Sequence, residues 1–500
     1  MSGNTFVKMP DGSVKHNLME GPFAFIGHNS GISGDLGLNW QINENHSLGM
    51  KMNYGGMLFG NQDIVFEDNV YANDELIDIV HSASHTTTPS SHTFTGNIYY
   101  DGNINKLHVN FNADFSDSGY KKETNVNENS QNDPAFIENL SDGVARMGAG
   151  KLVLSYPIWK GMFKIGTEET YVSAKQEYNS TKTEIPSSKA KIAENNISGF
   201  AEYALPFKYV QVVAGIRYEH VNFEYTNECS PKDNISRTHN NWFPSFNAST
   251  KIGPVGINLG YTTKIKRPRY DQLSTEMQYN NRFLYQTGDP TLLNEIQNTL
   301  SLNANWRWLT LTGAYEVVDN AIYQLGYPYD DDCTAMVKYS NAKETVRKLN
   351  IYLNASPTVG IWNPRYTVGM EKQYFETTVI DPRESTGTRV VKRNDPMFFV
   401  QANNSFKLKQ GWLIDLDYQY TSPFDYVMYK FTKPKHGLNL AVSKSFLKHD
   451  ALNVRLAWND ILNKTKEHVC TDYGNFIHNQ NNDYYSPSIQ LRLSYRFNTA

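Results

Sequence analysis

Apolar and polar residues alternate along many segments of the chain. Between Lys106 and Phe115, apolar residues stand at every second position and polar residues fill the positions between them. The same two-residue period recurs in Val255–Thr263 and in Trp412–Tyr420. Because successive side chains of a β-strand point to opposite faces, this period predicts strands with one apolar and one polar face. A soluble β-sandwich has similar alternation, so the period alone does not decide the class of fold.

The lengths of the connections between strands separate the two classes. Very short turns, such as Gly102–Ile104 and Gly253–Pro254, alternate along the chain with long polar loops rich in Asn, Asp, Ser and Gly. Short turns on one rim and long loops on the other are typical of barrels that cross the outer membrane. We therefore predict an all-β fold, an antiparallel transmembrane β-barrel with short periplasmic turns and long extracellular loops. About nineteen strands are visible in the pattern, and their ends are uncertain by a few residues.

The composition agrees with a barrel and excludes other classes. The chain has 32 Tyr and 25 Phe, and its mean hydropathy of -0.55 is too polar for a bundle of membrane helices. An apolar run of about 18 residues, as a transmembrane helix requires, does not occur. A barrel tolerates this polarity because only alternate residues of each strand face lipid. The net charge is -4 and no basic stripe is present, so nucleic acid is not an expected partner.

The last predicted strand, Ser488–Phe497, carries the most specific pattern. Its polar face alternates with an apolar face that ends on an aromatic residue. This strand resembles the C-terminal assembly signal of outer-membrane β-barrel proteins, although Asn498–Ala500 follow it. The resemblance implies the Gram-negative outer membrane as location, and outer-membrane lipid and the β-barrel assembly machinery as partners. The residues of the apolar face, which we expect to close the barrel, are Ile489, Leu491, Leu493, Tyr495 and Phe497.

A second stretch, Tyr261–Glu295, resembles the "RPSYxxL … GNPxLxPE" region in the barrels of TonB-dependent outer-membrane receptors. Ile32–Gly56 also resembles a hairpin of that family, and Asn294 stands where the family usually has Pro. The family implies a 22-stranded barrel, an N-terminal plug domain and a short box that contacts an inner-membrane energy transducer. The residues that match the motif are Arg267, Pro268, Tyr270, Gly288, Asp289, Pro290, Leu292 and Glu295.

The resemblance predicts the β-barrel portion of a receptor that transports a nutrient. Neither plug nor box is visible, so an energy-transducing inner-membrane complex is a partner only if a plug is supplied. A surface lipoprotein is a further possible partner. Two alternatives remain open at this point: a plugless outer-membrane channel or surface-binding barrel, and a truncated, non-functional fragment.

The predicted organisation is one barrel over residues 32–497, with an irregular start over residues 1–31 that is either an outer loop or a remnant strand. The plug domain is absent, and Met1–Gly21 does not have the pattern of a secretory signal. The first clear strand and the last strand both run towards the short-turn rim. At least one rising strand must therefore precede the first, and three strands would complete the 22 that the family implies.

Candidate chemistry outside these motifs is weak. Three cysteines, Cys229, Cys333 and Cys470, fall in predicted loops, and either one bridge or three free thiols is compatible with their number. His468 and His478 lie near Cys470, but they are too scattered to predict a four-ligand zinc site. No nucleophile elbow, phosphate loop or zinc-protease motif is present. We expect no catalytic residues, no cofactor and no metal, and the chain is not predicted to be an enzyme.

Overall fold

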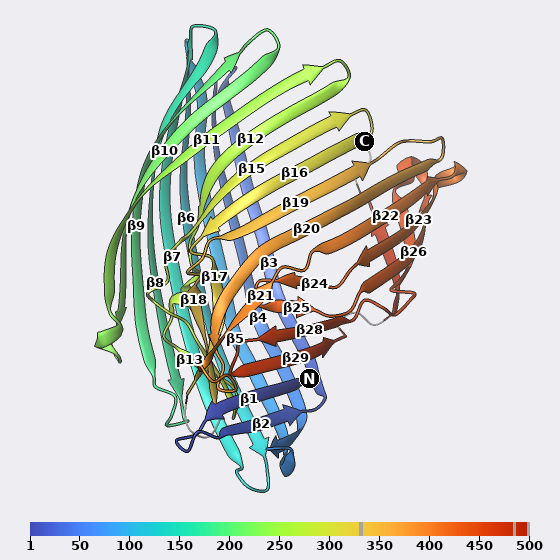
Figure 1. Cartoon of the computed structure of the whole chain (residues 1–500). Coiled ribbons are helices and arrows are strands. Elements are labelled where there is room, and N and C mark those ends of the chain that lie inside the picture. The colour runs from blue at the N-terminus through green and yellow to red at the C-terminus, as the bar shows by residue number, and fades with distance from the viewer. Residues whose placement is uncertain (330–333, 484–486, 498–500) are drawn as a thin grey trace.

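The computed structural model describes residues 1–329, 334–483 and 487–497, and most of them belong to β-strands (Figure 1). Within these residues, 26 strands form one sheet and four strands form a second, smaller sheet. No helix in these ranges has the length and apolar character needed to cross a membrane.

Nineteen strands of the large sheet form a curved wall in which each strand is antiparallel to the next along the chain. Their number and their hairpin order confirm the strand pattern that the sequence predicts. They are β3 (Phe23–Asn43), β4 (His46–Ala72), β5 (Glu75–Ile104), β6 (Leu107–Asn129), β7 (Ala135–Ile158), β8 (Gly161–Ser180), β9 (Ser188–Pro206), β10 (Val210–Asn227), β11 (Ile235–Ile252), β12 (Val255–Lys266), β15 (Glu295–Trp306), β16 (Leu309–Asp319), β19 (Val346–Ala355), β20 (Trp362–Ile380), β22 (Met397–Lys407), β23 (Trp412–Thr421), β26 (Lys435–Phe446), β27 (Leu452–Asn459) and β30 (Ser488–Tyr495).

Tight turns join these strands in pairs along one rim. Asn105, Gly253 and Arg307 adopt positive φ values of 55°, 58° and 51° in three of the turns. Such angles let the chain reverse within two residues. Exposed tryptophans stand next to this rim, and Trp159 is 93% exposed. Aromatic side chains at this level are typical of a membrane interface, and the short turns identify this rim as the periplasmic one.

The opposite, outer rim is built mainly by strand extensions. β4 has 27 residues and β5 has 30, and a tight turn at Asn73 and Asp74 joins them. The alternating pattern predicts a long loop between strands that end at residue 55 and begin again at residue 92. That prediction is wrong here, because the residues between them remain paired as strands. About ten residues of a tilted strand cross a bilayer, so more than half of β4 and β5 extends outside the membrane. The strands are shorter at the other end of the wall, where β30 has 8 residues.

The N-terminal segment corrects a second expectation. Residues 1–31 are not irregular: they contain β1 (Ser2–Lys8), β2 (Val14–Glu20) and the start of β3, which begins at residue 23 and not 32. β2 pairs with the outer end of β4, and β1 pairs with the loop strand β29 (Phe476–Asn482). The hairpin therefore connects the first and last parts of the wall at the outer rim. At the junction with β3, a Cβ on Gly21 would lie 1.9 Å from the carbonyl oxygen of Glu67, so only glycine fits there.

At the level of the membrane, the wall is open. In the described residues, β3 pairs along its length only with β4, and β30 pairs only with β27. The other edge of each strand has no partner strand in these ranges. Side chains from Ala24 to Asn43 and from Ile489 to Tyr495 are exposed. We call the space between these two edges the seam.

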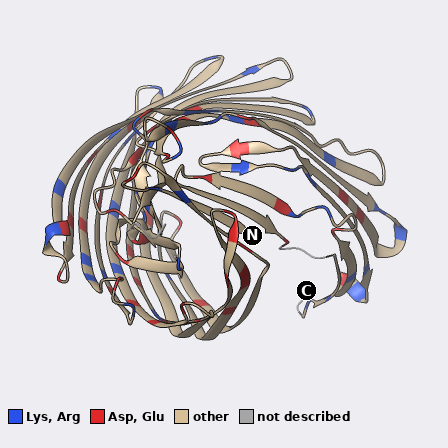
Figure 2. Ribbon diagram, turned by 60° about the horizontal axis from the view of Figure 1, so that its bottom comes forward, with Lys and Arg blue, Asp and Glu red and all other residues tan. Residues whose placement is uncertain are grey.

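Apolar packing is concentrated in the outer half, where loops fold inside the wall (Figure 2). One cluster of buried side chains includes Val318, Tyr323, Phe375, Met428 and Phe476. The small sheet inside the wall consists of β13 (Met277–Asn281), β14 (Leu284–Thr287), β17 (Ile322–Pro328) and β18 (Ala335–Asn341). The other loop elements are α1 (Tyr270–Leu273), β21 (Thr388–Arg393), β24 (Phe424–Tyr426), β25 (Tyr429–Phe431), β28 (Glu467–Asp472) and the short 3-10 turns Pro231–Asp233, Lys409–Gly411 and Lys448–Asp450.

Candidate ligand-binding site

The two halves of the Tyr261–Glu295 motif meet in space. The backbone N–H groups of Gly288 and Asp289 donate hydrogen bonds to the carbonyl oxygens of Ser274 and Gln272, at 2.9 and 2.6 Å. A Cβ on Gly288 would lie 2.4 Å from both of these oxygens, so the approach requires glycine. The segment that follows β12 is thereby fastened to the segment that precedes β15.

The remaining motif residues anchor this fastened segment to its surroundings. Leu292 is 1% exposed and belongs to a cluster of buried side chains in the outer half. Tyr270 packs against this cluster. Asp289 accepts hydrogen bonds from the backbone N–H and the hydroxyl of Thr291 and forms an ion pair with Lys338. Glu295 accepts a hydrogen bond of 2.7 Å from the backbone N–H of Ile322. The motif residues thus position the inner segments.

Arg267 connects the motif to the wall. Its guanidinium forms an ion pair of 3.1 Å with Glu194 on β9 and a second one with Glu219 on β10. Glu219 is 2% exposed and also accepts a hydrogen bond from Arg217. Two carboxylates from neighbouring strands therefore hold the chain where it leaves β12 and turns into the lumen.

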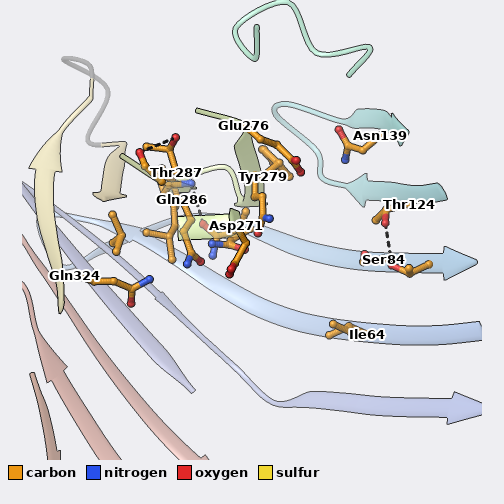
Figure 3. A pocket seen from close by; sticks show the side chains of 18 of the residues that line it. Ile64, Ser84, Thr124, Asn139, Asp271, Glu276, Tyr279, Gln286, Thr287 and Gln324 are labelled. Carbon is orange, nitrogen blue, oxygen red and sulfur yellow. Dashed lines mark hydrogen bonds between the residues drawn. The ribbon is translucent and has the colours of Figure 1, made fainter. Parts of the chain in front are cut away.

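A cavity of about 680 Å³ lies between the inner sheet and the wall in the outer half; we call it the outer cavity. Figure 3 shows Ser84, Thr124 and Asn139 on the wall strands and Glu276, Tyr279 and Gln286 on the inner segments. Most of the lining side chains are amides, hydroxyls or aromatic rings. Such a surface offers hydrogen-bond donors and acceptors together with flat apolar faces. Further lining residues are Thr5, Gln62, Thr86, Tyr120, Lys122, Gln176, Tyr178, Asp271, Gln278, Gln324, Tyr339, His478 and Gln480.

Among the side chains that line the outer cavity, Glu276 is a carboxyl group with a raised pKa. Burial raises its pKa from 4.5 to about 7, although the nearby Lys122 opposes this shift. Burial likewise lowers the pKa of the His478 imidazole from 6.5 to about 4. At neutral pH the cavity therefore contains a neutral histidine and a glutamate that is close to half protonated.

An arginine of the inner hairpin holds it against the wall. Arg282, between β13 and β14, forms ion pairs with Glu128 on β6 and Asp78 on β5, at 3.2 and 3.3 Å. The Tyr279 hydroxyl donates a hydrogen bond of 2.7 Å to Glu128, which is 2% exposed. These residues carry no signal in the sequence, because more than 140 positions separate Arg282 from either carboxylate and no local pattern marks the pair.

The strand that we expect to close the barrel is present as β30, and its apolar residues alternate with polar ones, so they share one of its two exposed faces. Ile489, Leu491 and Leu493 are 73%, 66% and 66% exposed. Tyr495 and Phe497 follow on the same face, with their rings edge to face at 4.9 Å. Exposed apolar side chains in this number belong in lipid.

The cysteines and histidines do not assemble a site within the described residues. Cys229 is exposed and Cys470 is partly exposed, and both are free thiols. Cys333 lies outside the described residues. His468 contacts the Asn481 side chain at 2.5 Å. The ranges that the structure describes contain no group of three or more metal-binding side chains.

A wall of antiparallel strands with an exposed apolar surface, short turns on one rim and a polar, loop-filled outer half defines an outer-membrane β-barrel protein. Comparison with known families agrees, because a model described as "Outer membrane protein beta-barrel family" matches residues 101–495. The chain belongs to this family, and its location is the outer membrane of Gram-negative bacteria. No curated protein sequence matches it.

Solved structures with a similar fold include three proteins that are described as transporters. The copper transporter OprC has a TM-score of 0.58 at 11% identity, over 93% of this chain and 75% of that one. The ferric citrate transporter FecA, unliganded, has a TM-score of 0.57 at 10% identity, over 99% and 78%. The FrpB iron transporter from Neisseria meningitidis (F5-1 variant) has a TM-score of 0.53 at 11% identity, over 99% and 82%. The likeness lies in the fold, and the prediction of a non-enzyme agrees with it.

Proposed function

We propose that the chain is the β-barrel portion of a TonB-dependent outer-membrane receptor that captures a scarce nutrient in the outer cavity. The observation that carries this proposal is the position of the cavity. It lies inside the tallest part of the wall, on the side opposite the periplasmic turns, where a ligand arrives from outside the cell. Its mixed lining of amides, hydroxyls and rings is suited to a polar ligand of several groups.

We further propose that polypeptide outside residues 1–500 fills the seam. β3 and β30 both run from the outer rim to the periplasmic rim, so an antiparallel ladder between them needs an odd number of strands. Unpaired backbone groups within hydrocarbon cost several kcal/mol each, by rough estimate, which disfavours an empty seam. β1 runs upward between β2 and β29, where the outer end of such a strand belongs.

The partners follow from this assignment. The β-barrel assembly machinery would insert the chain through its last strand. An energy-transducing inner-membrane complex would act through a plug domain, which we also place outside residues 1–500. A surface lipoprotein would cover the outer cavity in receptors for large ligands.

Growth of the host organism on single nutrients tests the proposed uptake. Deleting the gene should abolish growth on at least one limiting source of iron, cobalamin, peptide or glycan. The wild-type gene should restore growth, and a gene with Gln176→Ala and Gln278→Ala in the cavity lining should restore it poorly. Unchanged growth of the deletion strain on all four sources would count against the proposal.

Planar-bilayer recording separates this function from a plugless channel. A large, steady conductance from the purified 500-residue protein would favour the channel. A protein without steady conductance would favour a barrel portion that depends on further polypeptide.

A further inference from the structure

A second cavity, of about 340 Å³, lies between the inner faces of β9 to β11 and the segment that leads from β12 into α1. We call it the inner cavity. Its lining includes Arg237 and His239 from β11, Glu194 from β9 and Tyr270 from α1. α1 separates it from the outer cavity, because Asp271 lines the outer cavity and Tyr270 lines the inner one. Its volume is at the lower end of the range for small-ligand pockets.

Strand geometry brings two nitrogen-rich side chains into this cavity. Arg237 and His239 are two positions apart on β11, so both point to the same face. Their partners in the β10 ladder are Phe223 and Val221. The guanidinium of Arg237 lies over the ring of Phe223, with its carbon 4.5 Å from the ring centre. The planar guanidinium is therefore held in place by an apolar surface.

One nitrogen atom of each of these two side chains has no hydrogen-bond partner among the described residues. The Nε atom of Arg237 and the Nε2 atom of His239 are buried, and neither has a hydrogen-bond partner among the described residues. Within the same ranges, Arg237 also has no ion-pair partner. Buried donors are paired in nearly all protein structures, so unpaired nitrogens on two neighbouring side chains beside one cavity are suited to a bound acceptor.

The nearby carboxylates do not compensate Arg237. Glu194 is in an ion pair with Arg267 at 3.1 Å, and Glu219 is shared by Arg267 and Arg217. Arg269, at the entrance of α1, is paired with Asp271 at 2.7 Å. Each of these carboxylates is therefore already paired with another arginine. Glu194 and Asp289 attract the charge of Arg237, but among the described residues neither forms an ion pair with it.

We propose that the inner cavity binds a small oxyanion, a carboxylate or phosphate group, with Arg237 and His239 as its donors. A guanidinium donates two parallel N–H groups that match the spacing of two oxygens in either group. An imidazole N–H beside it supplies a third donor to the same anion. This assignment is independent of transport, because it requires only the folded barrel.

Isothermal titration of the purified 500-residue protein, folded in detergent, tests the assignment. Citrate and inorganic phosphate are the probes, and glucose is the neutral control. We expect binding at one site per chain for citrate, for phosphate or for both. Citrate alone would assign a carboxylate site, and phosphate alone a phosphate site. No heat from either anion would overturn the proposal.

Variants locate the bound anion. Arg237→Gln should weaken binding by about tenfold or more, and His239→Gln by a smaller factor. Arg307→Gln, which removes an arginine from a periplasmic turn, should leave the affinity unchanged. Equal affinity of Arg237→Gln and the wild type would overturn the proposal. If Arg237→Gln fails the heat-shift test of folding, Arg237→Lys and His239→Gln decide the question, and unchanged binding in both overturns it.

Discussion

Glu276 shows at the scale of one residue how the outer cavity couples folding to pH. Its pKa rises from 4.5 to about 7 because burial disfavours the carboxylate. The folded protein therefore holds the proton more tightly than the unfolded chain does. Below pH 4.5 both states are protonated and there is no penalty. Between pH 4.5 and 7 stability is lost as pH rises, and above pH 7 the loss is constant at up to about 3 kcal/mol.

Replacing Glu276 with Gln should remove this loss. The variant should gain stability over the wild type at pH 8 and little at pH 4.5, because Gln cannot ionise. Thermal unfolding in detergent at the two pH values measures the difference. Glu44→Gln in an exposed periplasmic turn is the matched control, and an equal response of both variants would contradict a special role for Glu276.

The sequence identified residues whose place in the fold depends on local backbone geometry. Gly288 and Leu292 stood out because a motif of fixed spacing contains them. Arg282 and Glu128 did not, since their ion pair depends on how distant hairpins are packed. Arg237 and His239 were missed for the same reason. Their spacing predicts a shared strand face, but only the fold shows that one buried nitrogen atom of each has no partner in the part of the chain that the structure describes.

At the scale of elements, the alternating pattern predicted the strand order and the periplasmic turns. It failed for the outer extensions of β4 and β5, because polar residues on both faces of a strand outside the membrane resemble a loop. The hairpin β1–β2 was missed as well, since two strands of seven residues depend on pairing with β4 and β29 for their stability.

The last strand carries a prediction about assembly. Phe497→Asp should impair insertion, because a charge would replace an aromatic side chain that is 87% exposed on the lipid face. Ser494→Asp, on the polar face of the same strand, is the control and should insert normally. The heat-dependent mobility shift on gels reports folding. A normal shift for Phe497→Asp would show that the assembly step does not depend on this residue.

At the scale of the whole molecule, the seam predicts a gradient of backbone protection. In the purified chain, amide hydrogens of β3 and β30 should exchange faster than those of β8, which has a paired strand on each side. Hydrogen–deuterium exchange with mass spectrometry measures this difference. Protection of β3 and β30 equal to that of β8 would mean that the seam is closed in the purified protein.

The common direction of β3 and β30 also limits how the chain can associate with itself. A symmetry axis perpendicular to the membrane preserves the sense of every strand, so each copy in the same bilayer offers only downward-running edges. Two such edges can meet only as a parallel ladder, which is the less stable arrangement and is foreign to this wall. Self-assembly around such an axis is therefore disfavoured by orientation alone, and an upward-running strand from a different stretch of sequence is the partner that these edges select.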